Sequence, residues 1–138
     1  MEKTTPYAHF RLEAGIVTCN YNSSVSPITD RILAEILQYK LHFQSGFEYP
    51  LLVRNVGHVE FTKTARAYLT EEWLSGASAL AWMTLNPVDQ TLAAFVYQRE
   101  KLSIPLLVTN NECKALKWLG RFIDRSDIDC RLSHAVLE

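Results

Sequence analysis

The sequence predicts an α/β fold: a mixed β-sheet with an N-terminal antiparallel hairpin, parallel later strands and about four packed helices. Two strand-like segments near the N-terminus are joined by a short connection that contains glycine. Three short apolar runs follow, and each one precedes a segment whose apolar residues recur at helical spacing. This alternation is typical of parallel strands joined by right-handed crossovers.

The chain is predicted to form one domain over residues 1–138. Its 138 residues, 48% of them hydrophobic, suffice to bury a core without a metal or a disulfide. No repeat, low-complexity tract or linker rich in Gly, Ser or Pro divides it. Residues 124–138 lack a clear period and are interpreted as a C-terminal extension of the domain.

The hairpin and the first helix come from local signals. Residues 7–12 and 16–21 are the paired strands, separated by Glu13-Ala14-Gly15. Ser26 followed by Pro27 predicts a helix start, and Asp30 suits the positive end of the helix dipole. The helix is expected to run to about Phe43 and to stop before Gly46. Its apolar face is expected to contain Ile28, Ile32, Leu33, Ile36 and Leu37.

The later strands are expected at residues 50–53, 79–83 and 104–108, whose continuous apolar character indicates burial on both faces. Residues 54–61 are expected to form a polar loop. Pro105 is best placed at the start of a strand or at a sheet edge.

Polar residues mark the starts of the remaining helices. Thr62 can cap the second helix, which Gly76 can end, and Asn86-Pro87 begins the third. Thr109, Asn110 or Asn111 can cap the last. The inward faces are expected to carry Ala65, Tyr68, Leu69 and Trp73 in the second helix, Val88, Leu92, Phe95 and Val96 in the third, and Ala115, Leu116, Leu119, Phe122 and Ile123 in the last.

Composition excludes several classes of partner. With 14 Lys and Arg against 15 Asp and Glu, the net charge is −1, so the chain has no strong basic field for nucleic acid. No apolar run approaches the roughly 20 residues of a membrane span, and the N-terminus lacks the apolar core of a secretory signal.

The cysteines indicate free thiols and a cytoplasmic location, because they are odd in number and far apart; they are Cys19, Cys113 and Cys130. Cys113, near a helix start, has a reactive thiol as its alternative.

Catalytic and cofactor motifs do not occur. The chain has no Gly-x-Gly-x-x-Gly, phosphate-binding loop or Gly-x-Ser-x-Gly elbow. The adjacent carboxylates Glu71 and Glu72 point about 100° apart on a helix, which favours a solvated face over acid–base catalysis. The histidines are too dispersed for a local metal motif; they are His9, His42, His58 and His134. We therefore expect no cofactor, no metal and no enzymatic activity.

One site is nevertheless suggested by topology. The carboxyl ends of three parallel strands meet at one edge of the sheet, where ligands of open α/β sheets bind and where helix N-termini favour anions. The candidate ligand-binding residues at this edge are Arg54, Asn55, His58, Thr62, Lys63, Arg66, Thr84, Asn86, Thr109 and Asn110. Arg54, Lys63 and Arg66, with His58 near them, form a local cationic group. The alternative is that Thr62, Asn86 and Asn110 or Asn111 only cap their helices and that Arg54 is solvated.

Two further alternatives stay open. The first is an enzyme whose catalytic residues are far apart in the sequence and meet only in the folded chain; its candidates are Arg54, His58 and an acidic residue from elsewhere. Aromatic residues would line a lipid-sized cavity, although at helical spacing they are more often core; they are Tyr68, Trp73, Trp82, Phe95, Trp118 and Phe122.

Several sequence motifs follow one another along the chain. They are YPLLVRNV at residues 49–56, TKTARAYL at 62–69, apolar strands at 77–83 and 104–108, and ALKWL at 115–119. Over about residues 16–123 the chain resembles the SpoIIAA-like group of STAS-related bacterial proteins. The resemblance implies a STAS-like α/β fold, frequent homodimerisation and no established enzyme. Anti-anti-sigma members carry Asp-Ser-Ser-Gly where this chain has Thr62-Lys63-Thr64-Ala65, so the phosphorylatable serine is missing. Thr64 is only a weak substitute phosphosite, and this departure disfavours partner switching through phosphorylation.

The leading hypothesis is a non-enzymatic, STAS-like binding or regulatory module that acts through an unidentified protein partner or as a homodimer. The alternative is a protein that binds a small anion or a lipid at the carboxyl ends of the parallel strands.

Overall fold

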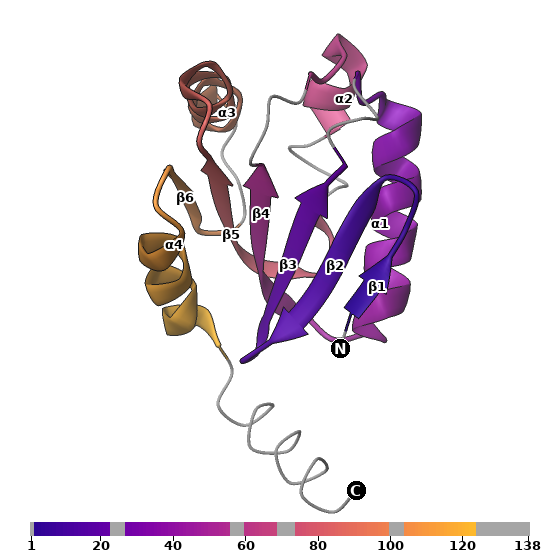
Figure 1. Ribbon diagram of the computed structural model, residues 1–138, viewed down its shortest axis with the longest axis vertical. Helices are drawn as coiled ribbons and strands as arrows, with labels where there is room; N and C mark the ends of the chain where they lie inside the picture. Colours follow the sequence, from indigo (N-terminus) through magenta and orange to yellow (C-terminus); the bar gives the residue numbers. More distant parts are fainter. Residues whose placement is uncertain (1, 23–26, 56–59, 69–73, 100–103, 124–138) are drawn as a thin grey trace, which may run out of the picture.

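The computed structural model describes residues 2–22, 27–55, 60–68, 74–99 and 104–123 (Figure 1). Its sheet has six strands in the order β1-β2-β3-β4-β5-β6, of which β1–β3 are antiparallel and β3–β6 parallel. The predicted fold class is confirmed. The strands are β1 (Glu2–Thr4), β2 (Ala8–Glu13), β3 (Ile16–Tyr21), β4 (Tyr49–Asn55), β5 (Ala77–Thr84) and β6 (Leu106–Thr109).

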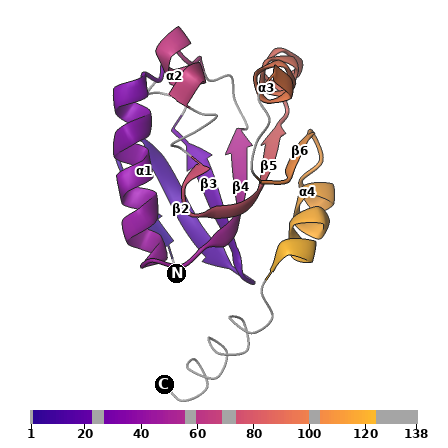
Figure 2. The same ribbon diagram turned by 180° about the vertical axis from the view of Figure 1, so that it is seen from behind.

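Helices cover the two faces of the sheet unequally. The helices are α1 (Asp30–Gln44), α2 (Lys63–Tyr68), α3 (Pro87–Arg99) and α4 (Glu112–Leu119), followed by the 3-10 turn η3 (Gly120–Phe122). Residues of α1, α2 and α3 join one core, and residues of α4 join a second core with Leu52, Ala81 and Met83. Figures 1 and 2 show α1 and α4 on opposite sides of the molecule. None of the described helices is long and apolar enough to cross a membrane.

The first helix begins later than its proline suggested. Its N-cap is Thr29, whose Oγ1 accepts a hydrogen bond from the Ile32 amide at 3.2 Å, so the expected start at Ser26-Pro27 is wrong. Ile28 instead pairs as a β-bridge with Phe61, and its N–H donates to the Glu60 carbonyl at 2.7 Å. That extended pairing keeps residue 28 out of the helix. The end at Gln44, before Gly46, is as predicted.

The strands differ from the expectation at their ends. Arg54 and Asn55 continue β4 and do not begin a loop, because they pair with Met83 and Thr84 of β5. Strand β6 begins after Pro105 at the sheet edge, as predicted, but its apolar side chains are only partly buried, because an edge strand has neighbouring strand side chains on one side only. Strand β1 was not predicted, since Glu2-Lys3-Thr4 has no apolar pattern and is held by pairing with β2.

Two apolar residues expected to face inward are exposed. Val88 is 68% exposed because α3 turns Asp89 and Ala93 inward. Leu116 is 39% exposed because α4 presents its neighbours Ala115 and Leu119 to the sheet. The side chains of Leu69, Trp73, Leu92, Phe95 and Val96, and the C-terminal extension with Cys130, lie outside the described residues.

The turn before β5 requires glycine. Gly76 has φ +83°, and a Cβ there would lie 3.0 Å from both Gln44 Nε2 and Leu41 Cδ2. Gly76→Ala is expected to destabilise the fold by about 1–2 kcal/mol, because backbone strain adds to crowding against α1. Gly120→Ala is the matched control, since nothing lies within 4 Å of its added Cβ. Urea denaturation measures both, and equal midpoints for the two variants would contradict the strain assigned to Gly76.

Candidate functional site

The face of the sheet opposite α1 is only partly covered. Helix α4 packs over β4, β5 and β6, whereas β1–β3 present polar side chains that stay partly or fully exposed. Pairing across the strands aligns these side chains in rows. One row runs from Thr4 through His9 and Asn20 to Arg54. We call this surface the open face of the sheet.

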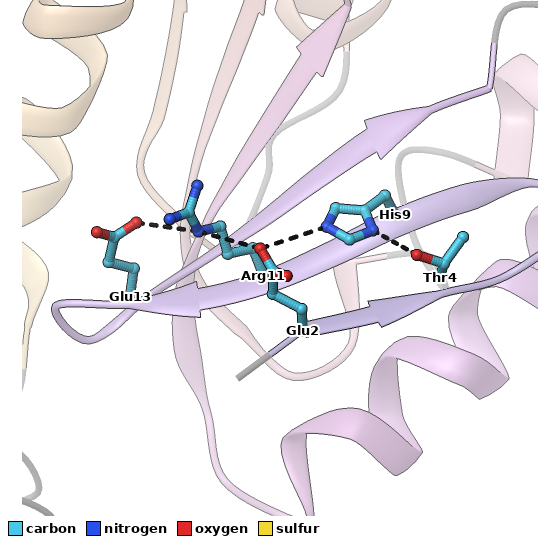
Figure 3. Close-up of polar contacts among 5 residues, drawn as sticks. All are labelled: Glu2, Thr4, His9, Arg11 and Glu13. Carbon is cyan, nitrogen blue, oxygen red and sulfur yellow. Dashed lines mark hydrogen bonds and ion pairs between the residues drawn. The ribbon is translucent and has the colours of Figure 1, made fainter.

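Ion pairs order the outer part of the open face (Figure 3). The Arg11 Nε lies 3.1 Å from Glu13 Oε2 and 3.5 Å from Glu2 Oε1. His9 Nε2 lies 3.7 Å from the same Glu2 oxygen, and His9 Nδ1 shares a 2.8 Å hydrogen bond with Thr4 Oγ1. Exposed pairs of this kind add little stability. Their effect is to hold charged groups of both signs along β1 and β2.

A groove of about 560 Å³ separates the hairpin from α4. Its floor is formed by Thr18, Asn20, Leu52 and Arg54. One wall belongs to the β2–β3 hairpin and carries Arg11, Glu13 and Ala14; the other belongs to α4 and the turn after it and carries Glu112, Leu116, Lys117 and Ile123. This volume lies within the range of ordinary ligand sites.

Arg54 is the charged group of the groove floor. Its Nε lies 3.2 Å from Glu112 Oε1 in the first turn of α4, yet this buried nitrogen makes no aligned hydrogen bond within the described part of the chain. Both side chains are about two-fifths exposed, at 36% and 40%. The side chains of Thr18 and Asn20 also make no hydrogen bond with any described residue. The floor therefore offers unused polar atoms beside an arginine, a combination that suits a carboxylate.

The residues expected to form one cationic group lie on different sides of the sheet. Arg54 lies on the open face, opposite Glu112. Lys63 and Arg66 belong to α2, which packs on α1 and contributes Ala65 to the opposite core. Neither of them joins the groove. His58 and the Asn55 side chain lie outside the described residues.

The threonines at the strand ends serve local turns. Thr84 and Thr109 are buried, and their Oγ1 atoms accept hydrogen bonds from the amides of Asn86 at 3.3 Å and Asn111 at 3.1 Å. Asn110 is exposed. These two hydrogen bonds have a structural role, and ligand binding at this edge of the sheet stays a prediction.

The side chains of Asn86, Asn111 and Thr62 accept hydrogen bonds that cap the starts of helices. Asn86 Oδ1 accepts from the Val88 amide at 2.9 Å, and Asn111, the N-cap of α4, accepts from the Lys114 amide at 3.0 Å. Thr62 Oγ1 accepts from the Ala65 amide at 3.2 Å. The capping alternative is thus confirmed as the local role of these three side chains.

Thr64 and the aromatic residues also have structural partners. Thr64 Oγ1 donates to Asp30 Oδ1 at 3.1 Å, so a phosphate there would face a carboxylate. Trp82 is 3% exposed and packs with Tyr21 and Phe61, at centroid distances of 6.3 and 5.9 Å. These rings are part of the core. No described group of three or more His, Cys, Asp or Glu side chains is placed to hold a metal ion.

The groove does not lie where the strand ends predicted a site, although the sequence contains a signal for it. His9, Arg11 and Glu13 alternate with the buried Ala8 and Phe10 along β2. Thr18 and Asn20 alternate in the same way along β3. Such alternation predicts one polar face on the hairpin. Nothing local predicts Glu112 beside Arg54, because the two residues meet only when α4 packs on the sheet.

Comparison with known proteins yields a family and no function. No curated protein matches the chain, and no solved structure matches it. Residues 10–123 match the family model described as "Domain of unknown function (DUF7793)". The matched stretch contains every residue named above as lining the groove. Because the match covers most of the chain, the protein belongs to the DUF7793 family.

Proposed function

We propose that the protein is a non-enzymatic binding module whose groove receives a segment of a partner protein. The observation that carries the proposal is the groove floor, where Arg54 lies beside the unused polar side chains of Thr18 and Asn20. A STAS-like, cytoplasmic and regulatory role belongs to the same proposal and is supported by the resemblance of the strand and helix motifs.

The chemistry of the groove selects the kind of segment. A carboxylate can accept paired hydrogen bonds from the guanidinium of Arg54, replacing the misaligned contact with Glu112. Leu116 and Ile123 on the opposite wall offer apolar surface next to it. The walls carry both signs of charge, which suits the alternating charges of a polypeptide better than a uniformly charged ligand. We expect an acidic residue followed or preceded by an apolar one.

Peptide selection by phage display on the full chain tests this specificity. Selected peptides are expected to be enriched in Asp or Glu next to Leu, Ile or Phe. Arg54→Gln is expected to weaken their binding about tenfold or more, because it removes the charged anchor of the floor. Binding is measured by fluorescence anisotropy.

Lys63→Gln is the matched control, since it removes one positive charge from the other side of the sheet. It is expected to leave binding within about twofold. Equal losses in Arg54→Gln and Lys63→Gln would show a general charge effect, and peptides with no acidic residue would contradict the proposed anchor. Circular dichroism verifies that both variants fold.

The other expectations remain predictions. Homodimerisation, implied by the resemblance, and the binding of a small anion or lipid at the strand ends are each compatible with the described fold. Neither one has support comparable to the groove.

A further inference from the structure

The outer side of α4 carries a concentration of positive charge. Lys114 and Lys117 lie on the exposed surface of the helix, and Arg121 follows in η3. They surround a shallow hollow of about 400 Å³ that also involves Asn111, Cys113 and Trp118. We call Lys114, Lys117 and Arg121, with Trp118, the basic face of α4.

These three cations form a cluster without the counter-charges that three arginines elsewhere in the described chain have. Arg11, Arg31 and Arg54 each lie within 4 Å of a glutamate carboxylate. In the part of the chain that the structure describes, Lys114, Lys117 and Arg121 form no ion pair, and no carboxylate lines their hollow. The positive charge of this face is therefore available to an external anion.

Helix stability explains only part of the arrangement. Lys117 lies in the last turn of α4, where the helix dipole favours a cation, and Arg121 lies beyond α4 in η3. Lys114 lies in the first turn, where the dipole disfavours a cation, and it is three residues from Lys117, a spacing at which like charges repel along a helix. Each effect is small. The position of Lys114 therefore has no gain in helix stability to account for it.

Trp118 adds an ordered apolar element to the same face. The ring is partly buried against the second core and packs on Phe122 with a centroid distance of 4.8 Å. Its position is therefore held by the fold before any ligand arrives. Fixed aromatic side chains next to cations are favoured at protein interfaces, because they contribute contact area at a low cost in conformational entropy.

We propose that the basic face of α4 is a docking surface for an acidic segment of a partner protein, one that also presents an apolar side chain to Trp118. Charge complementarity identifies the partner as acidic. Three cations on a chain of net charge −1 provide a local and not a general positive field, which suits a short acidic segment better than a nucleic acid backbone. The surface is separate from the groove, whose floor lies on the other side of α4, and only Lys117 lines both.

The probe is a fluorescein-labelled peptide of repeating Glu-Glu-Leu triplets, bound to the full chain and followed by anisotropy. The double variant Lys114→Gln/Arg121→Gln leaves the groove residues intact and is expected to weaken binding about fivefold or more, the effect of two exposed ion pairs. Lys63→Gln/Arg66→Gln makes the same change in net charge on α2 and is expected to change binding by less than about twofold. In two-dimensional NMR, the Trp118 indole signal is expected to shift on binding.

Several outcomes would overturn the proposal. They are equal losses in the two double variants, an indole signal of Trp118 that does not move, or tighter binding of an oligothymidylate of similar length with the same dependence on Lys114 and Arg121. The triple variant Asp124→Asn/Asp127→Asn/Asp129→Asn removes the acidic side chains that follow the basic face in the sequence. If the probe bound only to this variant, the occupant of the basic face would be the chain's own acidic segment and not a partner protein, which would overturn the proposal. Because the same peptide also fits the ligand proposed for the groove, both double variants are made in an Arg54→Gln background, so that the result does not depend on the proposed function of the groove.

Discussion

Lys40→Met is expected to stabilise the protein by about 1 kcal/mol at pH 7. Lys40 lies in α1 with its side chain fully buried, and burial lowers its pKa from 10.5 to about 8. Holding the charged form in the core at pH 7 therefore costs about 3 kcal/mol. Methionine removes that cost and fills a similar volume. It also removes the 2.9 Å hydrogen bond from the charged Nζ to the Ser75 carbonyl, a loss of about 2 kcal/mol.

The same lysine gives the wild-type protein an unusual dependence of stability on pH. Between pH 8 and 10.5 the unfolded chain binds more protons at Lys40 than the folded chain, so the free energy of unfolding rises with pH. Cys19 acts in the opposite sense, because burial raises the pKa of its thiol from 9.0 to about 12. Above pH 9 the unfolded chain loses that proton first, and stability falls with pH.

The sum of the two groups predicts the shape of the profile. These two residues raise stability by about 0.6 kcal/mol from pH 8 to 9, cancel up to about pH 10.5, and lower stability beyond it. In Lys40→Met the rise is absent and only the fall above pH 9 remains. Urea denaturation of both proteins over pH 7–10 measures the difference, in which shared titrating groups cancel.

Lys63→Met is the control, since this exposed lysine is not expected to alter the profile. If Lys40→Met were less stable than the wild type at pH 7, and the difference did not change with pH, the charged state assigned to Lys40 would be wrong.

The order of strands and helices could be predicted because its signals are local. Asn86 and Asn111 cap their helices, and alternating apolar residues mark the hairpin. The predicted start of α1 is wrong for a non-local reason. Pro27 satisfied the local rule, but pairing of Ile28 with Phe61, far along the chain, took precedence. Strand β1 also depends on its partner, since only pairing with β2 makes its polar residues a strand.

The candidate site was less predictable because side-chain direction in a strand depends on exact register. Arg54 was expected to follow the strand and to lie beside Lys63 and Arg66. It is still within β4, where alternate residues point to opposite faces, so it faces α4. The exact residue at which β4 ends therefore decides which charged side chains lie close together. The buried position of Lys40 was equally hidden, because a lysine at helical spacing on α1 gives no sign of which side it faces.

The wall of the groove depends on how firmly α4 is attached, and Leu119→Ala tests that attachment. Leu119 is completely buried in the second core, where it packs with Ala81, Met83 and Ala115. Removing its side chain is expected to destabilise the protein by about 3 kcal/mol, because apolar contacts are lost and the surrounding core closes the cavity only in part. Leu116→Ala makes the same chemical change three residues earlier on α4, at a position 39% exposed, and is expected to cost less than about 1 kcal/mol.

Hydrogen exchange separates loss of α4 from loss of the whole fold. The first core contains residues of α1, α2 and α3 and includes no residue of α4, so it does not depend directly on Leu119. Amide exchange in α4 is therefore expected to accelerate far more than exchange in β3 and β4 when Leu119 is truncated. Uniform acceleration across the sheet would instead make α4 part of one cooperative unit. In that case α4 could not move as a separate wall, and any ligand would have to enter the groove at its present width.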